Sequence, residues 1–138
     1  MPRSKPRSQL LHETWEAYEK SRDYPTAVAL AEGYIERSNH QAVQAQKKLE
    51  HNHAQEPPTG SVDEETKERV LARELLNGAA ICFWIKGRAL EASEQADDAR
   101  RAYKEARKFT YARAWDKDKK VLWSPAQAAG DRLAELGS

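Results

Sequence analysis

Histidine side chains that can bind a metal ion occur near the middle of the chain, at His51 and His53, with His40 nearby. On a helix, residues i and i+2 point about 200° apart. Two helical ligands face one ion only when they stand three or four residues apart. The spacing of His51 and His53 therefore predicts no metal site, and we expect no metal or other cofactor.

Acidic side chains at Glu13, Glu16 and Glu19, and in the run 63–65, are the candidates for paired catalytic carboxylates. Their spacing is instead typical of a solvated helix face, or of charges that favour the dipole near a helix N terminus. We recognise no catalytic signature elsewhere in the sequence. We therefore expect no catalytic residues and a protein that is not an enzyme.

The single cysteine, Cys82, is the candidate for a reactive thiol. It cannot form an internal disulfide, and its neighbours in 79–85 are apolar on every side. Free cysteine in such a setting usually packs as a small hydrophobic residue. We therefore expect Cys82 to be buried and inert.

The first seven residues are basic, with Arg3, Lys5 and Arg7, and no apolar residue follows Met1. We expect residues 1–7 to form a disordered, solvated arm. The arm can touch RNA or an acidic partner. However, 23 basic and 22 acidic residues give the whole chain no long-range field toward a polyanion, so nucleic acid binding is disfavoured.

Residues 8–138 have the size and composition of a single helical domain. A chain of 138 residues with 39% apolar and 33% charged side chains suits amphipathic helices with ionised outer faces. The basic start is followed by no apolar signal segment, and no stretch approaches the length of a membrane span. We therefore expect a cytoplasmic protein without a membrane anchor.

The first helix is predicted over about residues 8–21. Leu11, Trp15 and Tyr18 follow the i, i+4, i+7 spacing of an amphipathic helix, with Leu10 and Thr14 beside them. We expect this row, including Trp15, to face the core.

A second helix is predicted from Pro25, which suits a first helical turn, to about His53. A break at 38–40 is the main alternative, because Ser, Asn and His are weak helix formers. The two prolines and the glycine of 55–60 then end the helix, and we expect this loop to be exposed and mobile.

A third helix is predicted to begin at 61–64, where serine and glutamate are spaced as a capping box. Its apolar residues from Val70 onward surround the helix, which is typical of a helix enclosed by others. They form two adjacent rows, which are Leu71, Leu75, Cys82, Ile85 and Ala89, and Leu76, Ala79, Phe83 and Leu90. Asn77-Gly78 predicts either a kink or a turn within this helix, and the choice stays open.

A fourth helix is predicted with an ion pair between Asp97 and Arg101 in its first turn. Residues 113–123 show no clean period and are predicted as a loop held in place by its two tryptophans. Serine and proline at 124–125 are typical of a helix start, and we expect a short final helix that ends at Gly137.

The predicted helices resemble the tetratricopeptide repeat, a pair of antiparallel helices that stacks on the next pair. In this repeat a small residue of the first helix lies where the second helix, which opens with alanine, crosses it. Here Gly87 and Ala99 take these places, and Tyr24 and Ala27 resemble the turn of an earlier copy. The later copy is carried by Gly87, Leu90, Ala99, Tyr103 and Ala106. The resemblance implies an all-α fold of about five to seven helices, stacked as antiparallel hairpins in a short right-handed superhelix.

Tetratricopeptide repeats bind peptides or helices of other proteins on a concave face. The resemblance therefore implies a non-catalytic protein interaction module, an adaptor or a scaffold. The places that face this groove are taken here by His12, Glu16, Trp84 and Arg88. A homodimer formed through an uncapped end of the stack stays open. The alternatives are a nucleic-acid-associated protein that uses the basic arm and an enzyme of unrecognised type.

Overall fold

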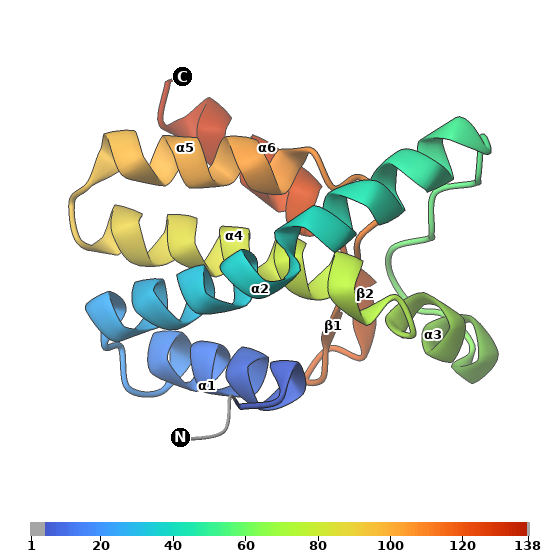
Figure 1. Cartoon of the computed structure of the whole chain (residues 1–138), viewed down its shortest axis with the longest axis horizontal. Helices are drawn as coiled ribbons and strands as arrows, with labels where there is room; N and C mark the ends of the chain where they lie inside the picture. The colour runs from blue at the N-terminus through green and yellow to red at the C-terminus, as the bar shows by residue number, and fades with distance from the viewer. Residues whose placement is uncertain (1–4, 138) are drawn as a thin grey trace.

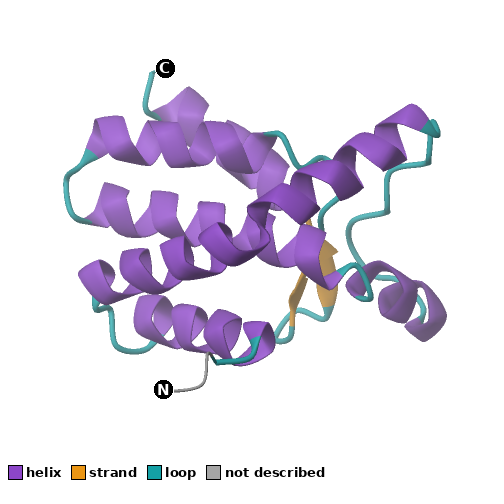
Figure 2. Cartoon of the chain, viewed as in Figure 1, coloured by secondary structure: helices purple, strands orange, loops and turns teal. Residues whose placement is uncertain are grey.

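A computed structural model describes residues 5–137, which contain six helices and one two-stranded antiparallel sheet (Figures 1 and 2). The helices are α1 Arg7–Glu19, α2 Tyr24–His51, α3 Glu64–Leu71, α4 Glu74–Ala92, α5 Ala96–Arg107 and α6 Pro125–Glu135. The strands are β1 Ala114–Asp116 and β2 Val121–Trp123. The predicted all-α class with five to seven helices is confirmed, with a small hairpin in addition.

Four helices lie side by side in the order α1, α2, α4, α5, and neighbours run in opposite directions (Figure 1). The last helix, α6, packs against α5 and α4, whereas α3 stands apart on the link between α2 and α4. The central helix is α4, in which twelve of 19 residues are buried, as expected for a helix enclosed by others. No helix within residues 5–137 is long and apolar enough to cross a membrane.

Two glycines let the flanking helices approach α4 from opposite sides. A Cβ at Gly78 would lie 1.9 Å from the hydroxyl oxygen of Tyr34 in α2. A Cβ at Gly87 would lie 2.4 Å from a ring carbon of Tyr103 in α5. Residues nine positions apart on a helix point about 180° from each other, because each residue turns the helix by about 100°. The two glycines therefore face opposite sides of α4. The side chain nearest to Gly87 is that of Tyr103, whereas the repeat pattern predicted Ala99 there.

The core consists of three clusters of buried apolar side chains, and α4 contributes to each of them. In the largest cluster Phe83 of α4 stacks on Phe109, with ring centroids 6.2 Å apart. Ile85 packs in the cluster that α4 shares with α1 and α2. Cys82 is fully buried in the third cluster, which confirms its expected burial, and this burial raises the pKa of its thiol.

In α1 the buried row of side chains is not the predicted one. Leu10, Thr14 and Ala17 are buried, whereas Leu11 and Trp15 stay partly exposed. The two rows lie next to each other on the helix, and the apolar spacing fits both of them. Leu11 and Trp15 therefore line a surface beside the core instead of filling it.

The helix break before α4 lies at a different place from the predicted one. The alternative break at 38–40 is wrong, because α2 is continuous there. The turn between α3 and α4 lies at 72–73, and both Asn77 and Gly78 are helical. The Asn77 amide stabilises this turn by donating to the carbonyl oxygen of Val70 over 3.0 Å.

Side-chain caps fix the starts of α3 and α6. The carboxylate of Asp63 accepts a hydrogen bond from the Thr66 N–H over 2.7 Å, so the cap of α3 is Asp63 and not the predicted Ser61. The hydroxyl of Ser124 accepts from the Gln127 N–H over 3.1 Å, which confirms the predicted start of α6.

Ion pairs in the first turn of α5 differ by one residue from the predicted pair. Asp97 pairs with Arg100 over 2.8 Å, and Asp98 pairs with Arg101. Both pairs use i, i+3 spacing, which brings helical side chains together as well as the predicted i, i+4 spacing does.

Residues 113–123 contain a β-hairpin, so the prediction of an irregular loop is wrong. Trp115 in β1 pairs with Leu122 in β2. Leu122 also exchanges two backbone hydrogen bonds with Gly60, of 2.8 and 2.9 Å, which join the hairpin to the link before α3. The turn contains no glycine, and Lys120 takes the left-handed conformation there with φ of 57°.

The loop 55–60 is held by Arg113. Its guanidinium donates to the carbonyl oxygens of Pro57 and Pro58, over 2.6 and 3.3 Å. Arg113 is only 4% exposed, and Pro57 is buried as well. The expectation of full exposure is therefore wrong at Pro57, because a side chain 56 residues away in sequence fixes the middle of the loop.

The predicted disordered arm, residues 1–7, is only partly covered, because residues 1–4 lie outside the described part of the chain. Lys5 pairs with Glu13 over 2.7 Å. Arg7 begins α1, and its Nε donates to the Ser38 hydroxyl oxygen in α2 over 3.1 Å. The prediction of disorder is therefore wrong from Lys5 onward.

Candidate functional site

All four tryptophans of the chain gather on one surface, which α1, α4 and the hairpin form together. Trp123 of β2 makes edge contacts with Trp15 of α1 and Trp84 of α4, with ring centroids 6.5 and 5.8 Å apart. Each of the four rings is partly exposed. Two hollows open on this surface, and Trp15 and Trp115 line both of them.

The larger hollow, which we call the α1–α4 groove, has a volume of about 810 Å³. It lies between α1, the start of α4 and the start of β1, and its size is within the range of sites that hold a ligand. Its apolar lining includes Leu11, Trp15, Leu71, Leu75, Ile81, Ala114 and Trp115. Its polar lining includes Arg7, His12, Arg37, Glu74, Asn77 and Arg113.

Three large apolar side chains of the groove have no part in the core. Leu71, Leu75 and Trp115 are partly exposed and belong to none of the three clusters of buried apolar side chains in residues 5–137. The ammonium of Lys67 lies 4.2 Å from the centre of the Trp115 ring, which positions that ring. Exposed apolar side chains grouped in a hollow favour an interaction surface over chance exposure.

Two arginines at the rim of the groove have only neutral partners. Arg7 donates to the Ser38 hydroxyl, to the Arg37 carbonyl oxygen and to the Gln41 amide oxygen. Arg37 donates to the carbonyl oxygen of Lys5. Within residues 5–137, no carboxylate lies within 4.0 Å of either guanidinium. The rim therefore offers positive charge to a ligand.

The smaller hollow has a volume of about 640 Å³ and includes the four tryptophans, Tyr18, Arg88 and the charged turn 116–119 in its lining. Arg88 is engaged within the protein. Its Nε donates to the Tyr18 hydroxyl over 3.1 Å, and its guanidinium lies 5.5 Å from the centre of the Trp84 ring. These contacts leave Arg88 less able to bind a partner than an unengaged surface arginine would be.

Beside this hollow, Glu91 joins α4 to α5 and α6. Its carboxylate accepts from the Tyr103 hydroxyl over 2.7 Å and from Nε of Arg132 over 3.1 Å, and Arg88 lies 3.9 Å away. Burial by itself raises the pKa of the Glu91 carboxyl. The hydrogen bonds from Arg132 and Tyr103, together with the nearby positive charges, lower this pKa by more than burial raises it. The net pKa lies below the ordinary value, so Glu91 is ionised at neutral pH.

The four residues predicted to bind a partner are not brought into one site. His12 lines the α1–α4 groove, and its Nε2 lies 3.4 Å from the Glu16 carboxylate. Glu16 lines neither hollow and also pairs with Lys20 over 3.3 Å. Trp84 and Arg88 line the smaller hollow.

Sequence reasoning missed Leu71 and Leu75 as site residues. Both fit the apolar row of a buried helix, and their periodicity gives no sign that this end of the row is uncovered. The turn at 72–73, which no glycine or proline predicts, separates Leu71 from α4 and leaves Leu75 in the first turn of α4. Only the position of α3 shows that they face a groove.

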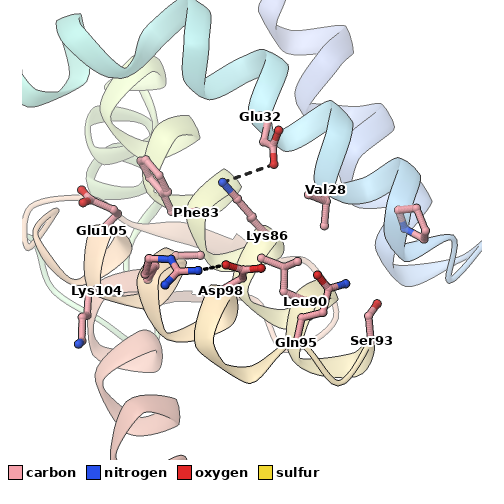
Figure 3. Close-up of a pocket in the computed structure, with 13 residues that line it drawn as sticks. Val28, Glu32, Phe83, Lys86, Leu90, Ser93, Gln95, Asp98, Lys104 and Glu105 are labelled. Carbon is pink, nitrogen blue, oxygen red and sulfur yellow. Dashed lines mark hydrogen bonds and ion pairs between the residues drawn. The ribbon is translucent and has the colours of Figure 1, made fainter. Parts of the chain in front are cut away.

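A third hollow, of about 730 Å³, lies between α2 and α5 above α4 (Figure 3). Lys86 reaches across it toward Glu32, and the two charged groups are 3.5 Å apart. Phe83 and Leu90 at its base are each only 7% exposed. Because Phe83 and Leu90 belong to the largest buried cluster and the ammonium of Lys86 is paired, this hollow is a weaker candidate for binding than the α1–α4 groove.

Within residues 5–137, no three side chains among His, Cys, Asp and Glu are grouped so that they can hold a metal ion. His51 ends α2 and is exposed, as is His53 beyond it.

Comparison of the chain with protein-family models, with curated proteins and with solved structures finds no match.

Proposed function

We propose that the protein is a non-catalytic interaction module that binds a segment of another protein in the α1–α4 groove. The arrangement supports this function. The hairpins α1–α2 and α4–α5 pack through α2 and α4, as two stacked tetratricopeptide-like repeats would. The groove lies between the first helices of these two hairpins, where the resemblance implies the binding face.

The observation that carries the proposal is the exposure of Leu71, Leu75 and Trp115. These side chains stabilise no buried cluster, yet they lie together in a hollow with room for several side chains of a partner. Their burial by a partner would release water from apolar surface, which is the main favourable term in protein association. Buried aromatic side chains also dominate binding energies at interfaces.

The rim gives the partner a second property. Arg7 and Arg37 present guanidinium groups without carboxylate partners, and arginine binds carboxylates through paired hydrogen bonds. Among the described residues, Glu74 is the one acidic residue in the lining of the groove. The partner segment is therefore apolar in its centre and acidic beside it.

Selection of peptides from a display library on the immobilised protein tests this function. Selected peptides should carry Trp, Phe or Leu next to Asp or Glu. Their affinity for Leu75→Asp should fall about 30-fold or more, the effect of losing about 2 kcal/mol at a central interface residue. The matched control is Val62→Asp, which places the same charge on a partly exposed residue outside the groove.

Both variants should give the circular dichroism spectrum of the wild type, because neither residue belongs to a buried cluster. Equal peptide affinity for the two variants would refute the groove as the binding site. A dimer in sedimentation experiments that only Leu75→Asp dissociates would show that the groove binds a second copy of the chain instead.

A further inference from the structure

A separate pocket of about 470 Å³ lies where the loop before α3 meets the turn between α3 and α4. One wall is formed by Pro57 and Pro58, and the other carries Arg69 and Arg73. The proline wall is fixed, because Arg113 donates to the carbonyl oxygens of both prolines. The pocket is therefore preformed, and Arg113, which fixes its proline wall, also lines the α1–α4 groove.

The two arginines of this pocket lack ionic partners. Within residues 5–137, no carboxylate lies within 4.0 Å of Arg69 or Arg73. Nη1 of Arg73 is shielded from solvent and has no hydrogen-bond acceptor among the described residues. A buried donor without an acceptor costs free energy, and such groups usually have a partner. The guanidinium of Arg73 is therefore not saturated by hydrogen bonds to residues 5–137.

The charges around the pocket favour an anion. Glu56 lines it, but its carboxylate lies 4.0 Å from the Arg113 guanidinium and is balanced by that charge. Besides the hydrogen bonds that Asp63 accepts at the start of α3, the charge of Arg69 lowers the pKa of the Asp63 carboxyl from beyond ion-pair distance. Among residues 5–137, however, neither Arg69 nor Arg73 has a carboxylate within 4.0 Å. Two like charges in one pocket repel each other. In addition Arg73 is the residue at the N terminus of α4, the positive end of a 19-residue helix dipole.

We infer that this pocket binds the phosphoryl group of a small phosphate ester. A phosphate monoester carries roughly two negative charges at neutral pH, which matches the two arginines. Arginine forks bind its oxygens through paired hydrogen bonds. The volume exceeds what phosphate alone fills, so the proline wall contacts the rest of the ester.

Titration of the full chain with sodium phosphate, at an ionic strength held constant with sodium chloride, tests the inference by NMR of the backbone amides. Saturable shifts should concentrate in the amides of residues 55–56 and 66–73, since the two prolines have no N–H. Phenyl phosphate should bind more tightly than inorganic phosphate, because its ring contacts Pro57 and Pro58. The reverse order of affinity would identify free phosphate as the ligand and refute the ester.

Arg69→Met and Arg73→Met should each weaken binding about tenfold or more, since hydrogen bonds to charged groups are lost. The matched control is Arg101→Met, which removes an arginine outside this pocket and should leave the affinity unchanged. Because Arg69 is exposed, its variant should keep the fold even if Arg73→Met does not. Equal affinity of Arg69→Met and Arg101→Met would overturn the inference, as would shifts that chloride alone reproduces.

Discussion

The ring of Tyr34 occupies the space that Gly78 leaves on α4. A Cβ at this glycine would lie 1.9 Å from the Tyr34 hydroxyl oxygen, and Tyr34 is only 2% exposed. The hydroxyl donates to the carbonyl oxygen of Glu74 over 3.3 Å, at the start of α4. The glycine therefore serves the packing of α2 on α4, although glycine in a helix interior weakens the helix itself.

Gly78→Ala should destabilise the protein by about 1–3 kcal/mol, because the buried Tyr34 ring has to move to avoid overpacking. This loss exceeds the gain of up to about 1 kcal/mol that alanine brings to a helix interior. The measurement is urea unfolding followed by circular dichroism. The control is Gly33→Ala in α2, where a Cβ meets only Leu10 at 3.9 Å, and which should be stabilising. Equal stability of the two variants would contradict the close packing at Gly78.

Arg113→Met should release the loop 55–60 and lower the free energy of unfolding by about 3 kcal/mol. The carbonyl oxygens of Pro57, Thr110 and Ala112 would each lose a donor. Limited proteolysis should cut the variant in this loop and leave the wild type intact there. Arg107→Met, a change at an exposed arginine of α5, is the control and should resist as the wild type does. Cleavage of the wild-type loop at the rate of the variant would disprove the anchoring.

Glu91→Gln should destabilise the protein at pH 7 by about 1–2 kcal/mol, because the Gln side chain cannot keep the charged hydrogen bonds with Arg132. The pKa of Glu91 is lowered in the folded state, so its stabilisation is present above the ordinary carboxyl pKa. This stabilisation is lost as the pH falls through the folded-state pKa. Urea unfolding between about pH 7 and about pH 3, which spans the range of carboxyl titration, should show the difference in stability from wild type shrinking toward the acid end.

The control for that series is Glu105→Gln, which removes an exposed pair with Lys108 and should cost little at any pH. If Glu91→Gln lowers the free energy of unfolding equally at both ends of the pH series, the contacts of Glu91 with Tyr103 and Arg132 stabilise the fold by packing and not by charge.

Cys82 should react with a thiol reagent only when the protein unfolds. It is fully buried, and burial raises the pKa of the thiol, so almost no thiolate is present at neutral pH. The labelling rate with a maleimide should rise in parallel with unfolding in urea. The urea-unfolded chain gives the reference rate, and native protein that reacts as fast would place Cys82 at the surface.

Much of the helical structure is determined by local sequence. The start of α6 follows from the Ser124 hydroxyl, which caps a first turn opened by Pro125. The continuity of α2 follows from apolar spacing that holds through the weak helix formers of 38–40. Such features depend on residues within a few positions of each other, so the chain needs no tertiary contact to specify them.

The position of the helix break shows where local sequence is insufficient. Gly78 predicts a kink or turn by its propensity, but the space it leaves is filled by Tyr34 and the helix continues. The break lies at 72–73 instead, next to an Asn77 side chain that bonds both Val70 and the backbone of Arg113. Arg113 lies 36 residues from Asn77 in sequence, so helix propensity, which depends on local residues, does not predict this contact.

The candidate site was predictable only in part. The sequence determined that Trp15 and Trp84 each belong to the apolar pattern of a helix, α1 and α4. It also predicted helical pairs that can form a groove. Tertiary structure alone decided that the hairpin lies against both helices, with Trp123 in contact with both rings, and that Leu71 and Leu75 stay uncovered. The physical reason is that side-chain burial depends on which distant segments pack together, whereas periodicity records only the order of residues along one helix.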